Sequence, residues 1–96
     1  MNEKNFGFLG TAFQQSLLKA IIEDKKFAVT IIDVIDSQYF DGPYFKYLMQ
    51  NIKELYTEFE IVPNYETLHQ KIMAENKDNV GKVHVDTLNA IRDKED

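Results

Sequence analysis

The fold class is decided by one stretch, residues 42–59, which reads Gly42-Pro43-Tyr44-Phe45-Lys46-Tyr47-Leu48-Met49-Gln50-Asn51-Ile52-Lys53-Glu54-Leu55-Tyr56-Thr57-Glu58-Phe59. Gly42-Pro43 is typical of a helix start, because a proline at the first helical position lacks an N–H that would need a partner. Large apolar residues then recur at helical spacing: Phe45, Leu48, Met49, Ile52, Leu55, Tyr56 and Phe59. The opposite face is polar, with Lys46, Gln50, Lys53, Glu54 and Thr57. The stretch therefore predicts a long amphipathic helix with its apolar stripe in the core.

Helical signals also flank this stretch. A first helix is expected from Thr11, because Thr11-Ala12-Phe13-Gln14 has capping-box spacing. Another is expected after Asn64, which can cap it, and a weaker one beyond Lys82. The residues expected on the buried faces of these helices are Phe13, Leu17, Ala20, Ile21, Tyr65, Leu68, Ile72, Val85, Leu88 and Ile91. The chain is therefore predicted to be all-α, a small orthogonal bundle of four to five helices.

Residues 27–35 are ambiguous between helix and strand. Their β-branched content suits a strand. The helical spacing of Phe27, Ile31, Val34 and Ile35, with Asp24 as a possible cap, favours a helix. Both assignments stay open here, with helix preferred. The aromatic pair that follows at residues 39–40 is expected to turn onto the core.

Length and composition indicate one small globular domain. A chain of 96 residues is of single-domain size, and its 44% hydrophobic and 28% charged content is typical of globular proteins. We expect an N-terminal arm over residues 1–10 and a single helical domain over residues 11–96. The absence of cysteine excludes disulfides, thiolate zinc sites and cysteine nucleophiles. No apolar run approaches the roughly 20 residues of a membrane helix, and no secretory signal pattern is present, so a cytoplasmic location without a membrane partner is predicted.

The charge balance argues against nucleic-acid binding. The 11 Lys and Arg residues face 16 Asp and Glu residues, which gives a net charge of -5, and Arg92 is the single arginine. Nucleic-acid binding depends largely on clustered cations that neutralise phosphates. Base reading commonly uses the bidentate fork of arginine. Strong direct DNA binding by this segment is therefore not expected.

No catalytic residue, cofactor-binding residue or metal ligand is predicted. Glu66 and His69 have the i, i+3 spacing of di-iron bundles, but such sites need a second motif and two further glutamates. His69 is interpreted as a partly buried structural residue, and His84 as part of a solvated loop or helix start. Ser16 lies in no nucleophile elbow, and no phosphate-binding loop is present. A small metal-dependent hydrolase using Glu66 and His69 stays as the least favoured alternative.

Five aromatic residues are candidates for a protein interface: Phe6, Phe8, Tyr39, Tyr44 and Tyr47. On a helical wheel Tyr47 points away from the apolar stripe, and Tyr44 lies at its boundary. Aromatic residues are enriched in interface cores. We therefore expect Tyr47→Ala to weaken association while leaving thermal stability nearly unchanged.

The order of motifs resembles the N-terminal domain of DnaB-like replicative DNA helicases. The resemblance covers residues 11–75 and is carried by four runs: Phe13–Ala28, Asp36–Phe40, Tyr44–Tyr56 and Val62–Leu68. Cellular members of the family usually place an aspartate after Pro-Val, where this chain has Val62-Pro63-Asn64. The sequence of this link is most similar to that of the helicases of large tailed phages.

This resemblance implies the N-terminal collar of a ring-shaped hexamer, which assembles the ring and engages primase or a helicase loader. The parent chain would be an ATP-dependent DNA helicase. Its ATP and Mg²⁺ would be bound in a RecA-like motor beyond a helical hairpin, and neither is present in this sequence. The chain has no stop signal at Asp96, so a truncated sequence is expected. The alternative is a stand-alone phage or bacterial helical adaptor that binds a protein partner.

Overall fold

A computed structural model describes residues 6–77 and 79–95 of the chain. These residues form five α-helices and two short 3-10 helices, and none of them is in a strand. The elements are η1 (Phe6–Leu9), α1 (Gly10–Glu23), α2 (Lys25–Ile31), η2 (Ser37–Tyr39), α3 (Pro43–Phe59), α4 (Tyr65–Glu75) and α5 (Asn79–Arg92). The all-α prediction is therefore confirmed.

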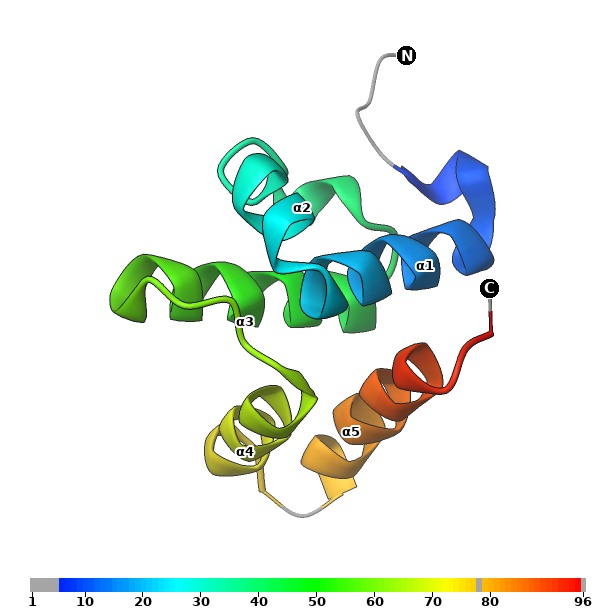
Figure 1. Cartoon of the computed structure of the whole chain (residues 1–96). Coiled ribbons are helices and arrows are strands. Elements are labelled where there is room, and N and C mark those ends of the chain that lie inside the picture. Colours follow the sequence, from blue (N-terminus) through cyan, green and yellow to red (C-terminus); the bar gives the residue numbers. More distant parts are fainter. Residues whose placement is uncertain (1–5, 78, 96) are drawn as a thin grey trace.

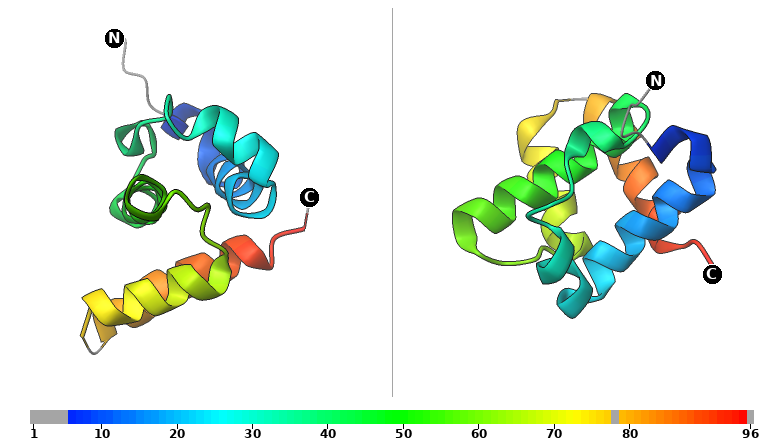
Figure 2. Two further views of the ribbon diagram at one scale, coloured as in Figure 1. Left: turned by 60° about the vertical axis from the view of Figure 1, so that its left-hand side comes forward. Right: turned by 90° about the horizontal axis from the view of Figure 1, so that it is seen from above.

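The helices pack in two groups (Figure 1). α1, α2 and α3 lie together on one side, while α4 and α5 run along each other on the other side, as the left view of Figure 2 shows. α5 contacts both α1 and α3, and α4 contacts α3. α3 is thus covered by other helices on more than one of its flanks.

Local capping signals set several helix starts as the sequence predicts. Asp24 caps α2 and Asn64 caps α4, because each side chain accepts a hydrogen bond from the backbone N–H three residues later, at 3.1 and 2.8 Å. α3 begins with Pro43 at its first position. Gly42 before it has a φ of 90°, a left-handed conformation that glycine adopts readily. The predicted starts of α3 and α4 are confirmed.

The start of α1 differs from the prediction. The helix begins at Gly10, with Leu9 as its N-cap and no capping hydrogen bond from a side chain. Gln14 is instead 2% exposed. Its Nε2 donates to the Gly10 carbonyl at 3.4 Å, and its Oε1 accepts from the Asp41 backbone N–H at 2.7 Å. The predicted capping box was wrong because Gln14 joins α1 to the loop before α3.

The expected arm over residues 1–10 is also different in its described part. Residues 6–9 form η1, which packs on α1, and Phe6 contacts the hydrophobic core. Gly10 already belongs to α1. The first half of the expected arm, residues 1–5, lies outside the described residues.

Residues 27–35 are resolved in favour of a helix that ends early. α2 stops at Ile31, and residues 32–34 form a turn that exposes 71% of Val34. Ile32 and Ile35 on either side are buried. The expected burial of Val34 was wrong, because the helical spacing on which it depended does not extend past the turn.

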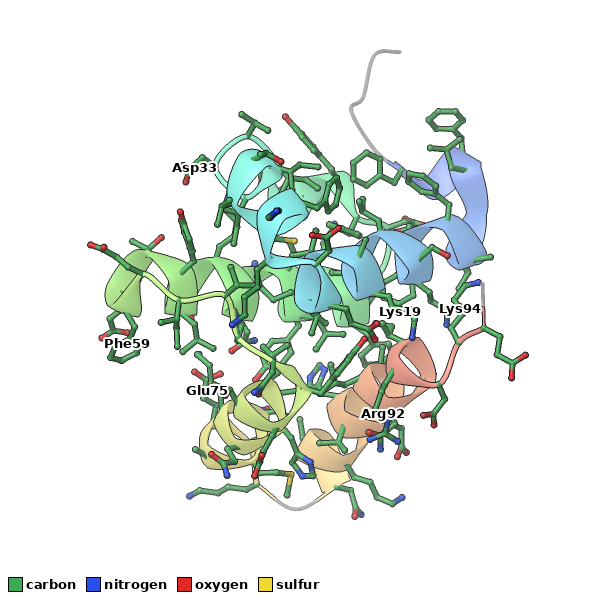
Figure 3. All side chains as sticks on the ribbon, in the orientation of Figure 1. Lys19, Asp33, Phe59, Glu75, Arg92 and Lys94 are labelled. Carbon is green, nitrogen blue, oxygen red and sulfur yellow. The ribbon has the colours of Figure 1, made fainter. Side chains whose placement is uncertain are left out.

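The core draws on every α-helix and on the segments between α2 and α3. Its buried apolar residues are Leu18, Ile21, Ile22, Ala28, Ile32, Ile35, Phe40, Leu48, Met49, Ile52, Leu55, Leu68, Ile72, Leu88 and Ile91. The centre of the α3 stripe is thus confirmed. Its last member is not, because Phe59 is 58% exposed at the free end of α3, where Figure 3 shows it. Phe13, expected on the buried face of α1, is 40% exposed.

The two helix groups are joined by polar contacts as well as by the core. Lys19 on α1 donates to the Arg92 carbonyl at the end of α5 over 2.7 Å, a contact whose two residues are labelled in Figure 3. Tyr65 at the start of α4 donates to Glu23 at 2.7 Å. None of the helices in the described ranges is long and apolar enough to cross a membrane.

Candidate protein-interaction surfaces

The five aromatic residues predicted to form an interface fall into two separate clusters. The first, which we name the aromatic corner, consists of Phe6, Phe8, Leu9, Phe13 and Tyr39. Phe6 is its centre: its ring lies edge-to-face against Phe13 at 5.7 Å, against Tyr39 at 5.7 Å and against the buried Phe40 at 5.3 Å. Edge-to-face pairs are favourable arrangements of aromatic rings. Phe6 therefore anchors η1 to the core.

The outer side of the aromatic corner is apolar and exposed. Phe8 is 85% exposed, Leu9 46% and Phe13 40%. These three residues lie within six positions of one another on η1 and the first turn of α1. Adjoining exposed hydrophobic side chains of this size often mark an interaction site. The structure thus brings Phe6 and Tyr39 together and leaves Phe8 free to contact another molecule.

The second cluster lies between α3 and α5, and it contains Tyr44, Tyr47 and His84. Tyr47 stacks on the His84 ring at 4.0 Å with an angle of 27°, and Tyr44 lies edge-on to His84 at 5.5 Å. Tyr47 also donates its hydroxyl to Glu75 at 3.0 Å and accepts from Asn76 Nδ2 at 2.7 Å. The expected outward orientation of Tyr47 was wrong, because α4 and α5 cover this flank of α3.

Charged and amide groups continue this cluster across three helices. Lys71 on α4 binds Glu54 on α3 at 3.0 Å and also binds Glu75, which points from α4 towards α3 in Figure 3. Asn51 is 2% exposed and donates to the Tyr47 carbonyl at 2.7 Å. Asn51 Oδ1 and His84 Nδ1 are buried without a hydrogen-bond partner among the described residues. Tyr47 therefore links polar groups of α3, α4 and α5, of which Asn51 is buried and Glu54 and Glu75 are exposed.

The pKa values in this cluster follow from burial and pairing. Burial raises the pKa of the Tyr47 hydroxyl. The hydrogen bond from Lys71 lowers the pKa of Glu75. Burial lowers the pKa of His84, since the charged imidazolium would lose its hydration there. At neutral pH His84 is therefore neutral against the face of Tyr47.

Both histidines differ from their interpretation from the sequence. His69, expected to be partly buried, is exposed on α4. His84, expected in a solvated loop or at a helix start, is half-buried inside α5. The reason is that the exposed side of α4 carries His69, whereas α5 turns His84 towards α3. Over residues 6–77 and 79–95, no three or more acidic or histidine side chains are grouped so that they could hold a metal ion.

A groove lies between α1, the start of α3 and α5. Its volume is about 360 Å³. It is lined by Gln15, Asp41, Gly42, Tyr44, Phe45, Asp86, Thr87 and Ala90. Tyr44 is the only one of these residues that the sequence marks as a candidate site residue, whereas it assigns Gly42 and Phe45 to the helix start and to the core. No local signal marks the others as parts of a site, because they come from three segments that only the packing of the helices brings together.

Comparison of the chain with protein-family models, with curated proteins and with solved structures found no match. Its function must therefore be inferred from its residues and their geometry.

The position of His84 leads to a pH dependence of stability. The unfolded chain titrates histidine near pH 6.5, and the folded protein binds that proton more weakly. The stability due to the neutral ring is therefore fully present above about pH 6.5 and is lost as pH falls through the lower pKa of the folded state. We expect the free energy of unfolding, measured with urea, to fall between about pH 7.5 and pH 5.5.

The matched variants are His84→Gln and His69→Gln. The first should reduce the fall in stability over this pH range, because it removes the group that titrates differently in the two states. The second should keep it, because His69 is exposed. A pH dependence that disappears in His69→Gln and persists in His84→Gln would contradict this assignment.

Proposed function

We propose that this chain is the N-terminal collar domain of a hexameric DnaB-like replicative helicase. In this role it would assemble the ring and engage primase or a helicase loader during DNA replication in the cytoplasm of a bacterium or a phage-infected host. The proposal is supported by the order of motifs over residues 11–75 and by the all-helical fold. The net charge of -5 also suits a domain that binds proteins rather than DNA.

The observation that carries an interaction role is the aromatic corner. Phe8, Leu9 and Phe13 expose large apolar side chains at adjoining positions. Phe6, on the same 3-10 helix as Phe8 and Leu9, packs against three aromatic rings and so fixes η1 to the core. Burial of this surface between copies of the chain would remove apolar area from water, the main favourable term in association. We infer that the aromatic corner is the contact between collar domains.

The test is sedimentation equilibrium of the chain over a series of concentrations, with Phe8→Ser as the variant. Wild-type protein should self-associate, and Phe8→Ser should raise the dissociation constant by more than about tenfold, which corresponds to 1.4 kcal/mol. At a concentration at which both proteins are monomeric, its melting temperature should stay close to that of the wild type, since Phe8 is 85% exposed. Titration with the primase encoded by the same genome then tests the second part of the collar role.

Phe59→Ser is the matched control. Phe59 is also an exposed phenylalanine, but it lies at the free end of α3, away from the aromatic corner. The Phe59→Ser variant should self-associate as the wild type does. A wild-type chain that stays monomeric at every concentration, or equal weakening by the two substitutions, would refute assembly through the aromatic corner.

The second candidate is a stand-alone helical adaptor that binds a different protein. The groove between α1, α3 and α5 favours it, because a concave surface with Tyr44 at its edge suits a partner's side chain better than a flat copy-to-copy contact. A monomeric chain that binds a protein through this groove would support the adaptor.

A further inference from the structure

The groove has the size and composition of a binding site for one side chain. Its volume of about 360 Å³ lies at the lower end of the range for ligand pockets, which is roughly 300–1,000 Å³. It has aromatic surface from Tyr44 and Phe45, and carboxylates from Asp41 and Asp86. Among the residues that the structure describes, no lysine, arginine or histidine lines it. The groove therefore combines apolar walls with two carboxylates.

The two carboxylates are available to a ligand. Asp41 makes no ion pair among the described residues, and the hydrogen bond from its backbone N–H to Gln14 holds its position. Asp86 has one described ion pair, a contact of 3.7 Å with Lys82 on the same helix. Both side chains of that pair are more than 60% exposed, so the pair contributes little and is easily exchanged.

The aromatic residues favour one kind of cation. Tyr44 is 46% exposed and Phe45 is half-buried, so the groove offers ring surface to a ligand. A guanidinium group stacks on aromatic rings and donates through a planar fork that fits carboxylates. An ammonium group is a compact, strongly hydrated charge that gains less from such a surface. The chemistry of the groove thus matches arginine better than lysine.

We propose that this groove binds an arginine side chain presented by a basic segment of a partner protein. The guanidinium pairs with Asp41 and Asp86, and the aliphatic part lies along Tyr44 and Phe45. The net charge of -5 attracts such a segment. A second copy of this chain is a poor source of the arginine, since its single arginine, Arg92, is followed by Asp93, Lys94, Glu95 and Asp96 and so does not lie in a basic segment.

The test uses N-acetyl-arginine amide as the probe in an NMR titration of the ¹⁵N-labelled chain. Its neutral analogue, N-acetyl-citrulline amide, has nearly the same shape without the charge. We expect the arginine probe to shift the backbone amides of Tyr44, Asp86 and Thr87 in a saturable way. The citrulline probe should bind at least about fivefold more weakly, as expected for the loss of an exposed ion pair.

Matched aspartate variants distinguish binding of the probe in the groove from its general attraction to the negative charge of the protein. Asp41→Asn and Asp86→Asn should each weaken binding of the arginine probe by about fivefold. Asp33→Asn changes the net charge equally, but Asp33 is exposed in the turn after α2, on the opposite side of the fold from α5 in Figure 3. It should leave the affinity unchanged.

Three results would overturn the proposal: no saturable shifts at the groove, equal binding of the two probes, or equal weakening by Asp33→Asn and Asp86→Asn. The experiment is independent of the collar role, because it reports on the groove and not on the aromatic corner. Self-association that is lost in Phe8→Ser can therefore be confirmed or refuted separately.

Discussion

Replacing Phe40 with alanine is expected to lower the free energy of unfolding by about 3–5 kcal/mol, the range for truncating a buried phenylalanine. Phe40 follows η2 directly and is 0% exposed. Its ring lies 5.3 Å from the centre of Phe6, so its removal also takes away the support of the aromatic corner. The cavity left behind would lie between helices that are already fixed by their own packing, which limits collapse around it.

The measurement is the midpoint of urea unfolding at a concentration at which the chain is monomeric, with Phe8→Ala as the matched control. The control removes the same atoms from a side chain that is 85% exposed, and its effect should stay within about 0.5 kcal/mol. Domains of this size are marginally stable, so Phe40→Ala can unfold the chain entirely. Phe40→Leu then serves as the milder variant, and it should lower the free energy of unfolding by less than Phe40→Ala does. Equal midpoints for Phe40→Ala and Phe8→Ala would show that Phe40 is not in the core.

Replacing Tyr47 with alanine is expected to cost about 2–4 kcal/mol. The substitution removes the stack on His84 and leaves Glu75 and Asn76 without their shared hydroxyl partner. A buried or half-buried polar group that loses its partner costs about 1–3 kcal/mol. This expectation replaces the one drawn from the sequence, in which Tyr47→Ala left stability nearly unchanged.

Tyr47→Phe separates the contribution of the Tyr47 ring from that of its hydroxyl, and Tyr44→Ala is the matched control on a more exposed tyrosine. Tyr47→Phe keeps the ring on His84 and loses only the hydroxyl, so it should cost about 0.5–1.5 kcal/mol. Tyr44→Ala removes the same side chain from a residue that is 46% exposed, and it should cost less than Tyr47→Ala. A wild-type urea midpoint for Tyr47→Ala would show that its contacts with α4 and α5 do not stabilise the fold.

Several features could be predicted because their causes are local in the chain. The starts of α3 and α4 depend on Gly42-Pro43 and Asn64, which act on backbone groups within a few residues. The buried centre of α3 follows from its own helical spacing, which marks Leu48 and Ile52 as inward-facing. The all-α class follows from the same signals repeated along the chain.

The sides of each helix that meet another helix were decided only by the tertiary structure. A helical wheel gives the direction of Tyr47 but cannot show that α5, which begins 32 residues later, covers that direction with His84. For the same reason helical spacing predicts a buried Phe59, although this residue lies at the free end of α3 and is 58% exposed. The groove around Asp41 and Asp86 is the clearest case, because its walls come from segments far apart in the sequence. Spacing within one helix determines which residues form its apolar face. The packing of the helices against one another determines which of those residues are buried and which grooves remain between the helices.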